Sequence, residues 1–177
     1  ASARGSRING FGPEYGSPIL PTADCLREMM EEKDLWPINQ EVWNYLDGGG
    51  FHKMTTHFDQ GVGHYGPSSN IDAYAMKAQA FGGLAWRAIW ECWNANKFDG
   101  GDRFSTGLLF WYNNSPNRQV CGRLYDWSLE PTAALYFSQD ANEPLHAQMD
   151  FLKNTLSVNN EFPRDFKGRL IARVLDM

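Results

Sequence analysis

The segment from residue 70 to residue 96 constrains the fold more than any other part of this chain, because it predicts one long helix. Small and apolar side chains recur in it at steps of three and four residues, so they share one face of the helix. These residues are Ile71, Ala75, Ala78, Gly82, Ala85, Ile89 and Cys92. Small side chains along such a face let a helix pack closely on a sheet. We therefore expect an α/β fold in which this helix covers a sheet.

Strands are expected on both sides of this helix. Residues 6–15 suit a strand that ends in a glycine-rich loop, and residues 105–114 begin with a continuous apolar run. A run of this kind is typical of a strand that is buried on both faces, as in a parallel sheet. Between the first strand and the long helix, Thr22 is a suitable N-cap for a helix of about three turns. Residues 36–70 are broken repeatedly by proline and glycine, and we expect a long loop there.

The pattern changes after about Asn142. A helix with Pro131 near its first turn is expected before that point. Three short strands are expected after it, at residues 144–151, 155–160 and 168–177. A (β/α)₈ barrel takes about 250 residues and an immunoglobulin-like sandwich about 100. The chain offers only two βα units and three further strands, which is too little for either fold. We therefore predict two partial domains, residues 1–142 and residues 143–177, and expect the termini of the chain to cut through both.

Composition excludes several classes of function. The chain has 177 residues, of which 42% are hydrophobic and 21% charged, so it can bury a sizeable core. Its formal net charge is −5, and its lysines and arginines do not cluster among aromatic residues, so nucleic acid is not expected as a partner. No apolar run reaches the length of a membrane span, so a membrane is not expected as a partner either. The three cysteines lie far apart and are expected to be buried thiols: Cys25, Cys92 and Cys121.

The start of the chain bears on localisation. The first residue is Ala1, and the residues after it lack the apolar core of a signal peptide. We expect a cut or a late start in a longer reading frame, with any targeting signal upstream. The localisation stays unknown, with a secreted, periplasmic or vacuolar one favoured.

Polar and aromatic side chains follow the predicted parallel strands at their C-terminal ends. Glu14 ends the first strand, and Trp111, Tyr112, Asn113 and Asn114 end the second. In a (β/α)₈ barrel such side chains converge on one opening. A carboxylate attacks or stabilises the oxocarbenium-like anomeric centre of a sugar, an indole covers the apolar face of a pyranose, and amides bond its hydroxyls. The pattern indicates a sugar site; the alternatives are a solvated glutamate and a core tryptophan.

Five stretches of the chain resemble the final third of the catalytic barrel of glycoside hydrolase family 2. The closest likeness is to its branch of exo-β-glucosaminidases, β-mannosidases and plant-type endo-β-mannosidases, and it covers nearly all of positions 10 to 150. The stretches are "GFGPEYGSPILPTADCLREMM", "DLWPINQEVWNYLDGGG", "YGPSSNIDAYAMKAQAFGGLAWRAIWECWN", "TGLLFWYNN" and "RLYDWSLEPTAALYFSQDANEPLHAQ".

This resemblance implies the C-terminal portion of a (β/α)₈ TIM barrel, followed by the first strands of an immunoglobulin-like β-sandwich. It also implies retaining hydrolysis of β-linked mannosides or glucosaminides. The family's nucleophile is the glutamate of a segment that here reads "FGPEYG", which makes Glu14 the nucleophile. Its sugar-stacking tryptophan matches Trp111 in "LLFWYNN", and Tyr15, Tyr112 and Asn113 are expected to bind substrate near it. Neither a metal nor another cofactor is implied.

The family's general acid/base is a glutamate that follows an asparagine, upstream of the nucleophile, and nothing before Glu14 supplies it. We therefore expect this chain to be inactive alone, with a carbohydrate substrate and the remaining chain or chains of the same enzyme as partners. In "SPNRQVCGRLYDW", Gly122 and Arg123 stand where related proteins carry tryptophan and glutamine, which bears on the subsite beyond the cleaved bond. The alternative is a non-catalytic remnant that binds carbohydrate without cleaving it.

Three groups of residues keep open roles. The segment 36–70 carries aromatic residues that either wall the sugar pocket or pack inside: Trp36, Trp43, Phe51 and Tyr65. Its histidines match no zinc spacing and are expected to face substrate or solvent: His52, His57 and His64. Glu143 and His146 are expected to make structural contacts at the domain boundary.

Overall fold

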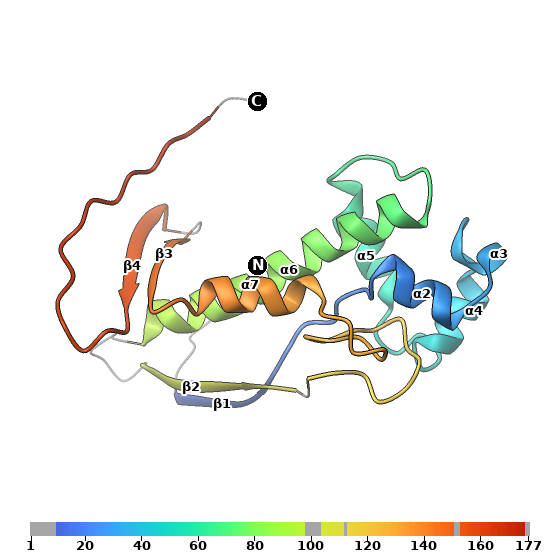
Figure 1. Cartoon of the computed structure of the whole chain (residues 1–177), viewed down its shortest axis with the longest axis horizontal. Helices are drawn as coiled ribbons and strands as arrows, with labels where there is room; N and C mark the ends of the chain where they lie inside the picture. The colour runs from blue at the N-terminus through green and yellow to red at the C-terminus, as the bar shows by residue number, and fades with distance from the viewer. Residues whose placement is uncertain (1–9, 98–103, 112, 151–152, 176–177) are drawn as a thin grey trace.

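The long helix α6 (Ile71–Asn96) is the axis of the molecule, and every other helix and strand lies along it or at one of its ends (Figure 1). The computed structural model describes residues 10–97, 104–111, 113–150 and 153–175. Asn70 caps α6, because its side-chain oxygen accepts a hydrogen bond from the Ala73 N–H at 2.9 Å. The predicted long helix is confirmed. None of the helices in the described part of the chain combines the length and apolar content that a membrane span needs.

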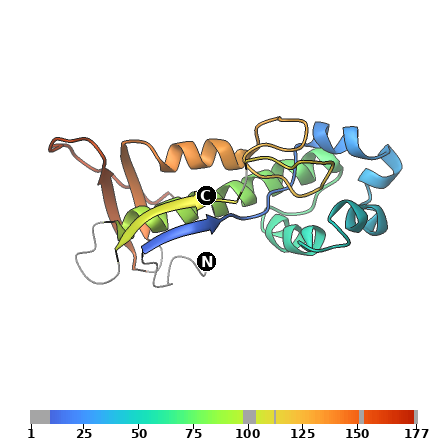
Figure 2. The same cartoon turned by 90° about the horizontal axis from the view of Figure 1, so that it is seen from below.

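A two-stranded parallel sheet runs along α6 (Figures 1 and 2). Strand β1 (Gly10–Tyr15) pairs with β2 (Ser105–Phe110), so the predicted parallel pairing is confirmed. Burial of β2 on both faces is not observed, since Leu109 is 55% exposed. A pair of strands with a helix on one face leaves the other face open to solvent. The expectation of a strand buried on both faces was therefore wrong for this chain.

The tryptophans of α6, rather than its small residues, make the main contacts with the sheet. Trp93 packs edge-on against Tyr15 and donates its indole N–H to the Gly107 carbonyl at 3.0 Å. The small residues serve other neighbours. A Cβ on Gly82 would lie only 2.6 Å from Ile19 Cγ1, so a glycine is required where the chain leaving β1 crosses the helix. Ala85 is only half-buried.

Four short helices gather at the N-terminal end of α6, where the largest core lies. They are α2 (Ala23–Met29), α3 (Glu32–Leu35), α4 (Gln40–Leu46) and α5 (Met54–Gly63). Thr22 caps α2 as predicted, by accepting from the Cys25 N–H at 3.2 Å. The prediction of one long loop over residues 36–70 was wrong. Both α4 and α5 lie within it, because Trp43, Met54 and Phe58 reach the core although prolines and glycines interrupt the sequence between them.

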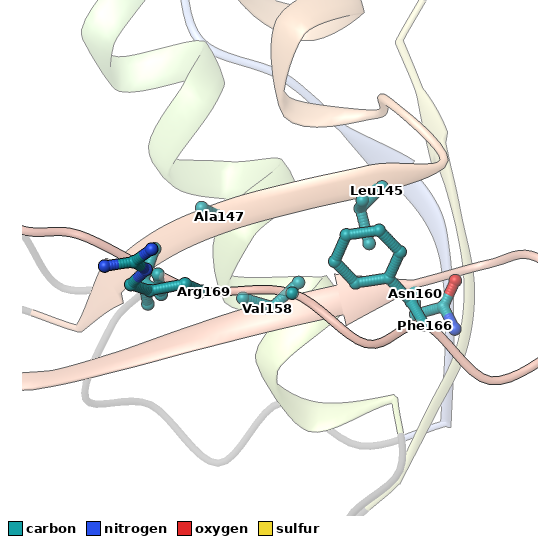
Figure 3. A pocket seen from close by; sticks show the side chains of 8 residues that line it. Leu145, Ala147, Val158, Asn160, Phe166 and Arg169 are labelled. Carbon is teal, nitrogen blue, oxygen red and sulfur yellow. The ribbon is translucent and has the colours of Figure 1, made fainter.

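The C-terminal end of α6 carries a helix and a hairpin. Helix α7 (Ala133–Ala141) packs on α6, and β3 (Leu145–Asp150) pairs antiparallel with β4 (Thr155–Asn160). The third predicted strand is not observed, since residues 161–175 contain no strand. This segment instead crosses the hairpin, so that Phe166 and Arg169 lie near Leu145 and Val158 around a cavity of about 460 Å³ (Figure 3).

Candidate functional site

Parallel pairing brings Glu14 and Trp111 to the same edge of the sheet. Tyr15 pairs with Phe110, and the Trp111 N–H donates a hydrogen bond to the Tyr15 carbonyl at 2.7 Å. Both strands therefore end side by side. Glu14 and Trp111 line one cavity of about 400 Å³, a size within the usual range for ligand pockets. The predicted convergence of the carboxylate and the indole is present in the structure.

The aromatic residues around Glu14 have different environments. Trp111 is 49% exposed, so it is not a core tryptophan. Tyr15 also lines the cavity, but its ring packs against Trp93 with the ring centroids 5.0 Å apart. Asn113 is exposed and lies outside the cavity; its carbonyl accepts a hydrogen bond from the Tyr125 N–H at 3.0 Å. Tyr112, the remaining predicted substrate-binding residue, lies outside the described residues.

A glycine-rich loop between α4 and α5 supplies another part of the cavity wall. Gly48, Gly49 and Gly50 all have positive φ, at 63°, 79° and 79°, where a side chain would be strained. This turn brings Phe51 and His52 to the cavity that Glu14 lines. Sequence patterns left open whether this segment walls the pocket, and the signal that points to it is the run of three glycines.

Asp47 holds the glycine-rich loop in place. Its side chain is buried, and its Oδ1 lies 2.8 Å from His52 Nδ1. Its Oδ2 accepts a hydrogen bond from the Met54 N–H at the start of α5, at 3.3 Å. Charge-assisted hydrogen bonds of this kind are stronger than those between neutral groups. His52 is therefore fixed at the edge of the cavity.

The other residues with open roles divide between core and surface. Trp43 is buried and Trp36 packs partly buried against the same core, so neither walls the cavity. Tyr65 and His64 are exposed and lie outside the cavity. His57 belongs to α5, and its side chain lies outside the described part of the structure.

Arg123 places a positive charge in the wall of this cavity. It is buried, and its Nη1 donates to the Gly122 carbonyl at 3.1 Å and lies 2.8 Å from Cys121 Sγ. A guanidinium keeps its charge in such surroundings. The sequence marked this position as a departure from related proteins but did not place it in the same cavity as Glu14. Burial raises the pKa of the Cys121 thiol to about 11, so this cysteine is not a competing nucleophile.

Known proteins resemble the chain in sequence and in structure, although no protein-family profile matches it. It is 29% identical over 167 residues to the exo-β-D-glucosaminidase of Amycolatopsis orientalis, covering 89% of this chain and 16% of that protein. It is 28% identical over 170 residues to the mannosylglycoprotein endo-β-mannosidase of Lilium longiflorum, covering 85% of this chain and 17% of that protein. The crystal structure of the Amycolatopsis orientalis exo-chitosanase matches with a TM-score of 0.70 at 29% identity, over 85% of this chain and 18% of that one.

The chain is related to glycoside hydrolase family 2. The relationship extends over most of its length. The β-D-mannosidase of Dictyoglomus thermophilum shares the fold, with a TM-score of 0.66 at 19% identity over 82% of this chain and 17% of that one. The chain spans less than a fifth of the length of the relatives it matches.

A second cavity of about 870 Å³ adjoins the first in this family 2 relative. Phe51 and His52 line both cavities, so they stand at the junction between them. Tyr45 of α4 and residues 117–119 contribute to the wall of the second cavity. The glycine-rich loop thus contributes to the walls of two neighbouring cavities.

A cluster at the far end of α6 ties helices and hairpin together. Ligand-type atoms of Asp140, Glu143 and His146 lie within 4.8 Å of one another. Asp140 pairs with Arg87 at 2.6 Å, and His146 Nε2 lies 3.2 Å from a carboxylate oxygen of the buried Glu91. His146 makes a structural contact with α6, whereas Glu143 is exposed, and the position of a domain boundary here stays a prediction. The absence of a metal or other cofactor from the chemistry stays a prediction.

Proposed function

We propose that this chain is part of a retaining β-glycoside hydrolase that cleaves β-linked mannosides or glucosaminides, with Glu14 as its nucleophile. The observation that carries the proposal is the shared cavity of Glu14 and Trp111 at the ends of two parallel strands. The relatives named for exo-β-glucosaminidase and endo-β-mannosidase activity support the substrate class. Glycosidases of both kinds act on sugars joined by β-linkages.

The mechanism in this proposal is a double displacement. A carboxylate oxygen of Glu14 attacks the anomeric carbon, the bond to the leaving oxygen breaks, and that oxygen takes a proton from a general acid. Water then attacks the anomeric carbon, gives its proton to the same acid/base group, and releases the sugar from Glu14. The two carboxyl groups of a retaining site lie about 5–5.5 Å apart.

The acid/base in this proposal comes from polypeptide outside the chain. Residues 1–142 then form the C-terminal part of a (β/α)₈ barrel, and residues 143–177 begin an immunoglobulin-like sandwich. The β1–α6–β2–α7 order fits two βα units of a barrel, and the β3–β4 hairpin fits the start of a sandwich. A chain with half of the catalytic pair has no turnover by itself.

Trp111 covers the apolar face of the reacting sugar in this proposal. Its exposed indole lines the same cavity as the carboxylate, and exposure of an indole face in a cavity supports stacking of a pyranose ring. Tyr15 lies on the same wall, and Tyr112 and Asn113 follow Trp111 along the chain. We assign these three residues to substrate binding around the stacked sugar.

Covalent trapping tests the proposal directly. The complete enzyme that contains this chain is treated with a 2-deoxy-2-fluoro-β-mannosyl fluoride, which forms a slowly hydrolysed glycosyl-enzyme, and the labelled peptide is mapped by mass spectrometry. We expect the label on Glu14, with no label in the Glu14→Gln variant. A label on another carboxylate refutes the assignment. Saccharide binding without any label or turnover favours a carbohydrate-binding remnant instead.

A further inference from the structure

The second cavity presents the two most exposed aromatic side chains in the described part of the chain. Tyr45 and Phe51 are each 80% exposed, and both line this cavity. An aromatic ring left in solvent gains nothing from burial in the fold. Beside a hollow of about 870 Å³, the two rings offer flat apolar faces to a ligand.

The polar groups of this cavity are donors rather than free carboxylates. Among the described residues that line it, Asp47 is the only acid, and its two oxygens already bond His52 and the Met54 N–H. Asn117 and Gln119 carry amides at the rim. Arg118 adds a guanidinium that lies 5.0 Å above the Trp127 ring, which holds it in place.

The positive charge in the wall of the second cavity is therefore expected to favour neutral ligands over cationic ones. Hydroxyl and amide groups find hydrogen-bonding partners among the side chains at its rim. A protonated amine meets Arg118 and finds no exposed carboxylate to pair with. The lining suits a neutral sugar better than an amino sugar with a free ammonium group.

We propose that the second cavity is a subsite for the sugar on the leaving-group side of the cleaved bond, and that this sugar has no free amine. The inference rests on the proposed function. Every substrate that reacts with Glu14 in the first cavity carries a leaving group, and the second cavity shares Phe51 and His52 with the first. Phe51 and His52 then stand where the glycosidic bond passes from one cavity to the other.

Three substrates with the same β-linked reacting sugar test this subsite in the complete enzyme. One is the glycosyl fluoride, whose leaving group is a single atom and fills no subsite. The others are disaccharides that end in N-acetylglucosamine or in glucosamine and differ only in the acetyl group. At a pH that protonates the amine, we expect a kcat/KM about fivefold higher for the N-acetylated disaccharide. Arg118→Gln is expected to reduce that preference.

Substitution of Tyr45 tests whether an aromatic ring in the second cavity contributes to binding of the leaving-group sugar. We expect Tyr45→Ala to lower the ratio of kcat/KM for the N-acetylated disaccharide to kcat/KM for the fluoride about three- to tenfold. Tyr45→Phe, which keeps the ring, is expected to restore most of the ratio. The matched control is Tyr136→Ala, because Tyr136 is 56% exposed on α7 and lines neither cavity.

The outcomes separate the two proposals. If the wild-type enzyme does not hydrolyse the fluoride, the proposed function fails and the subsite fails with it. If the fluoride is hydrolysed but Tyr45→Ala behaves like Tyr136→Ala, only the subsite is refuted. A wild-type preference for the glucosamine disaccharide refutes the charge argument.

Discussion

Two contrasting sets of aromatic residues are present in this molecule, one in the core along α6 and one at the rims of the two cavities. Trp43 and Trp86 are each 1% exposed, and each indole N–H donates to a backbone carbonyl, of Asp34 at 2.9 Å and of Ser17 at 2.8 Å. Trp111 and Phe51 are instead 49% and 80% exposed. Buried rings stabilise the fold, whereas exposed rings beside a hollow contribute little to folding. The difference separates residues that hold the structure from residues available to a ligand.

The largest effect is expected at the rim, from Glu14→Gln in the complete enzyme. Loss of the nucleophile should lower kcat by at least about a thousandfold. The fold should remain intact, because Glu14 is exposed at the end of β1. Steady-state rates and circular dichroism measure the two properties separately. Turnover at the wild-type rate would end the nucleophile assignment.

The comparison between core and rim predicts losses of stability of very different size for two aromatic truncations. Trp43→Ala should lower the free energy of unfolding by about 3–5 kcal/mol, since it leaves a cavity in the core and removes the hydrogen bond from the indole to the Asp34 carbonyl. Phe51→Ala should lower it by less than about 1 kcal/mol, because little of its ring is buried. Urea unfolding of both variants measures the difference. Equal losses would contradict the separation of core from rim.

Trp111→Ala is expected to weaken sugar binding without a comparable loss of stability. Removal of one stacking surface should cost about 1–3 kcal/mol of binding free energy. Calorimetric titration of the inactive Glu14→Gln enzyme with substrate, with and without the second substitution, isolates binding from chemistry. If the affinity for substrate does not fall, Trp111 does not bind the sugar and its role is structural.

The smallest effect is expected from thiol reagents, which test whether the cysteines close to the first cavity are shielded from solvent. Cys121 neighbours Arg123 of the first cavity, yet it is fully buried. Burial raises the pKa of Cys121 to about 11 and that of Cys25 to about 12. The reactive thiolate is therefore a fraction on the order of a thousandth or less at pH 8, and it grows only as the pH rises toward these values. Mass spectrometry after iodoacetamide at pH 8 should find neither thiol modified while the enzyme is folded.

Local patterns in the sequence predicted the parts of the site that depend on nearest neighbours along the chain. The spacing of small residues indicated α6, and the apolar run after it indicated β2. Because parallel strands end at one edge, Glu14 and Trp111 were expected together, and they line the same cavity. The three separated cysteines were expected to be buried thiols, and they are. Periodicity is a local property of one segment, so the sequence alone determines it.

Only the tertiary structure decided which residues of segment 36–70 reach the cavity. Trp43 and Phe51 are both aromatic residues in a segment that prolines and glycines interrupt. Trp43 is nevertheless buried in the core, whereas Phe51 is exposed at the rim of the cavity. Their separation depends on the turn at Gly48–Gly50, on the bonds of Asp47, and on how α4 and α5 pack against α6. Arg123 reaches the cavity from a segment more than a hundred residues after Glu14. Contacts between distant segments decide burial, and no spacing within one segment encodes them.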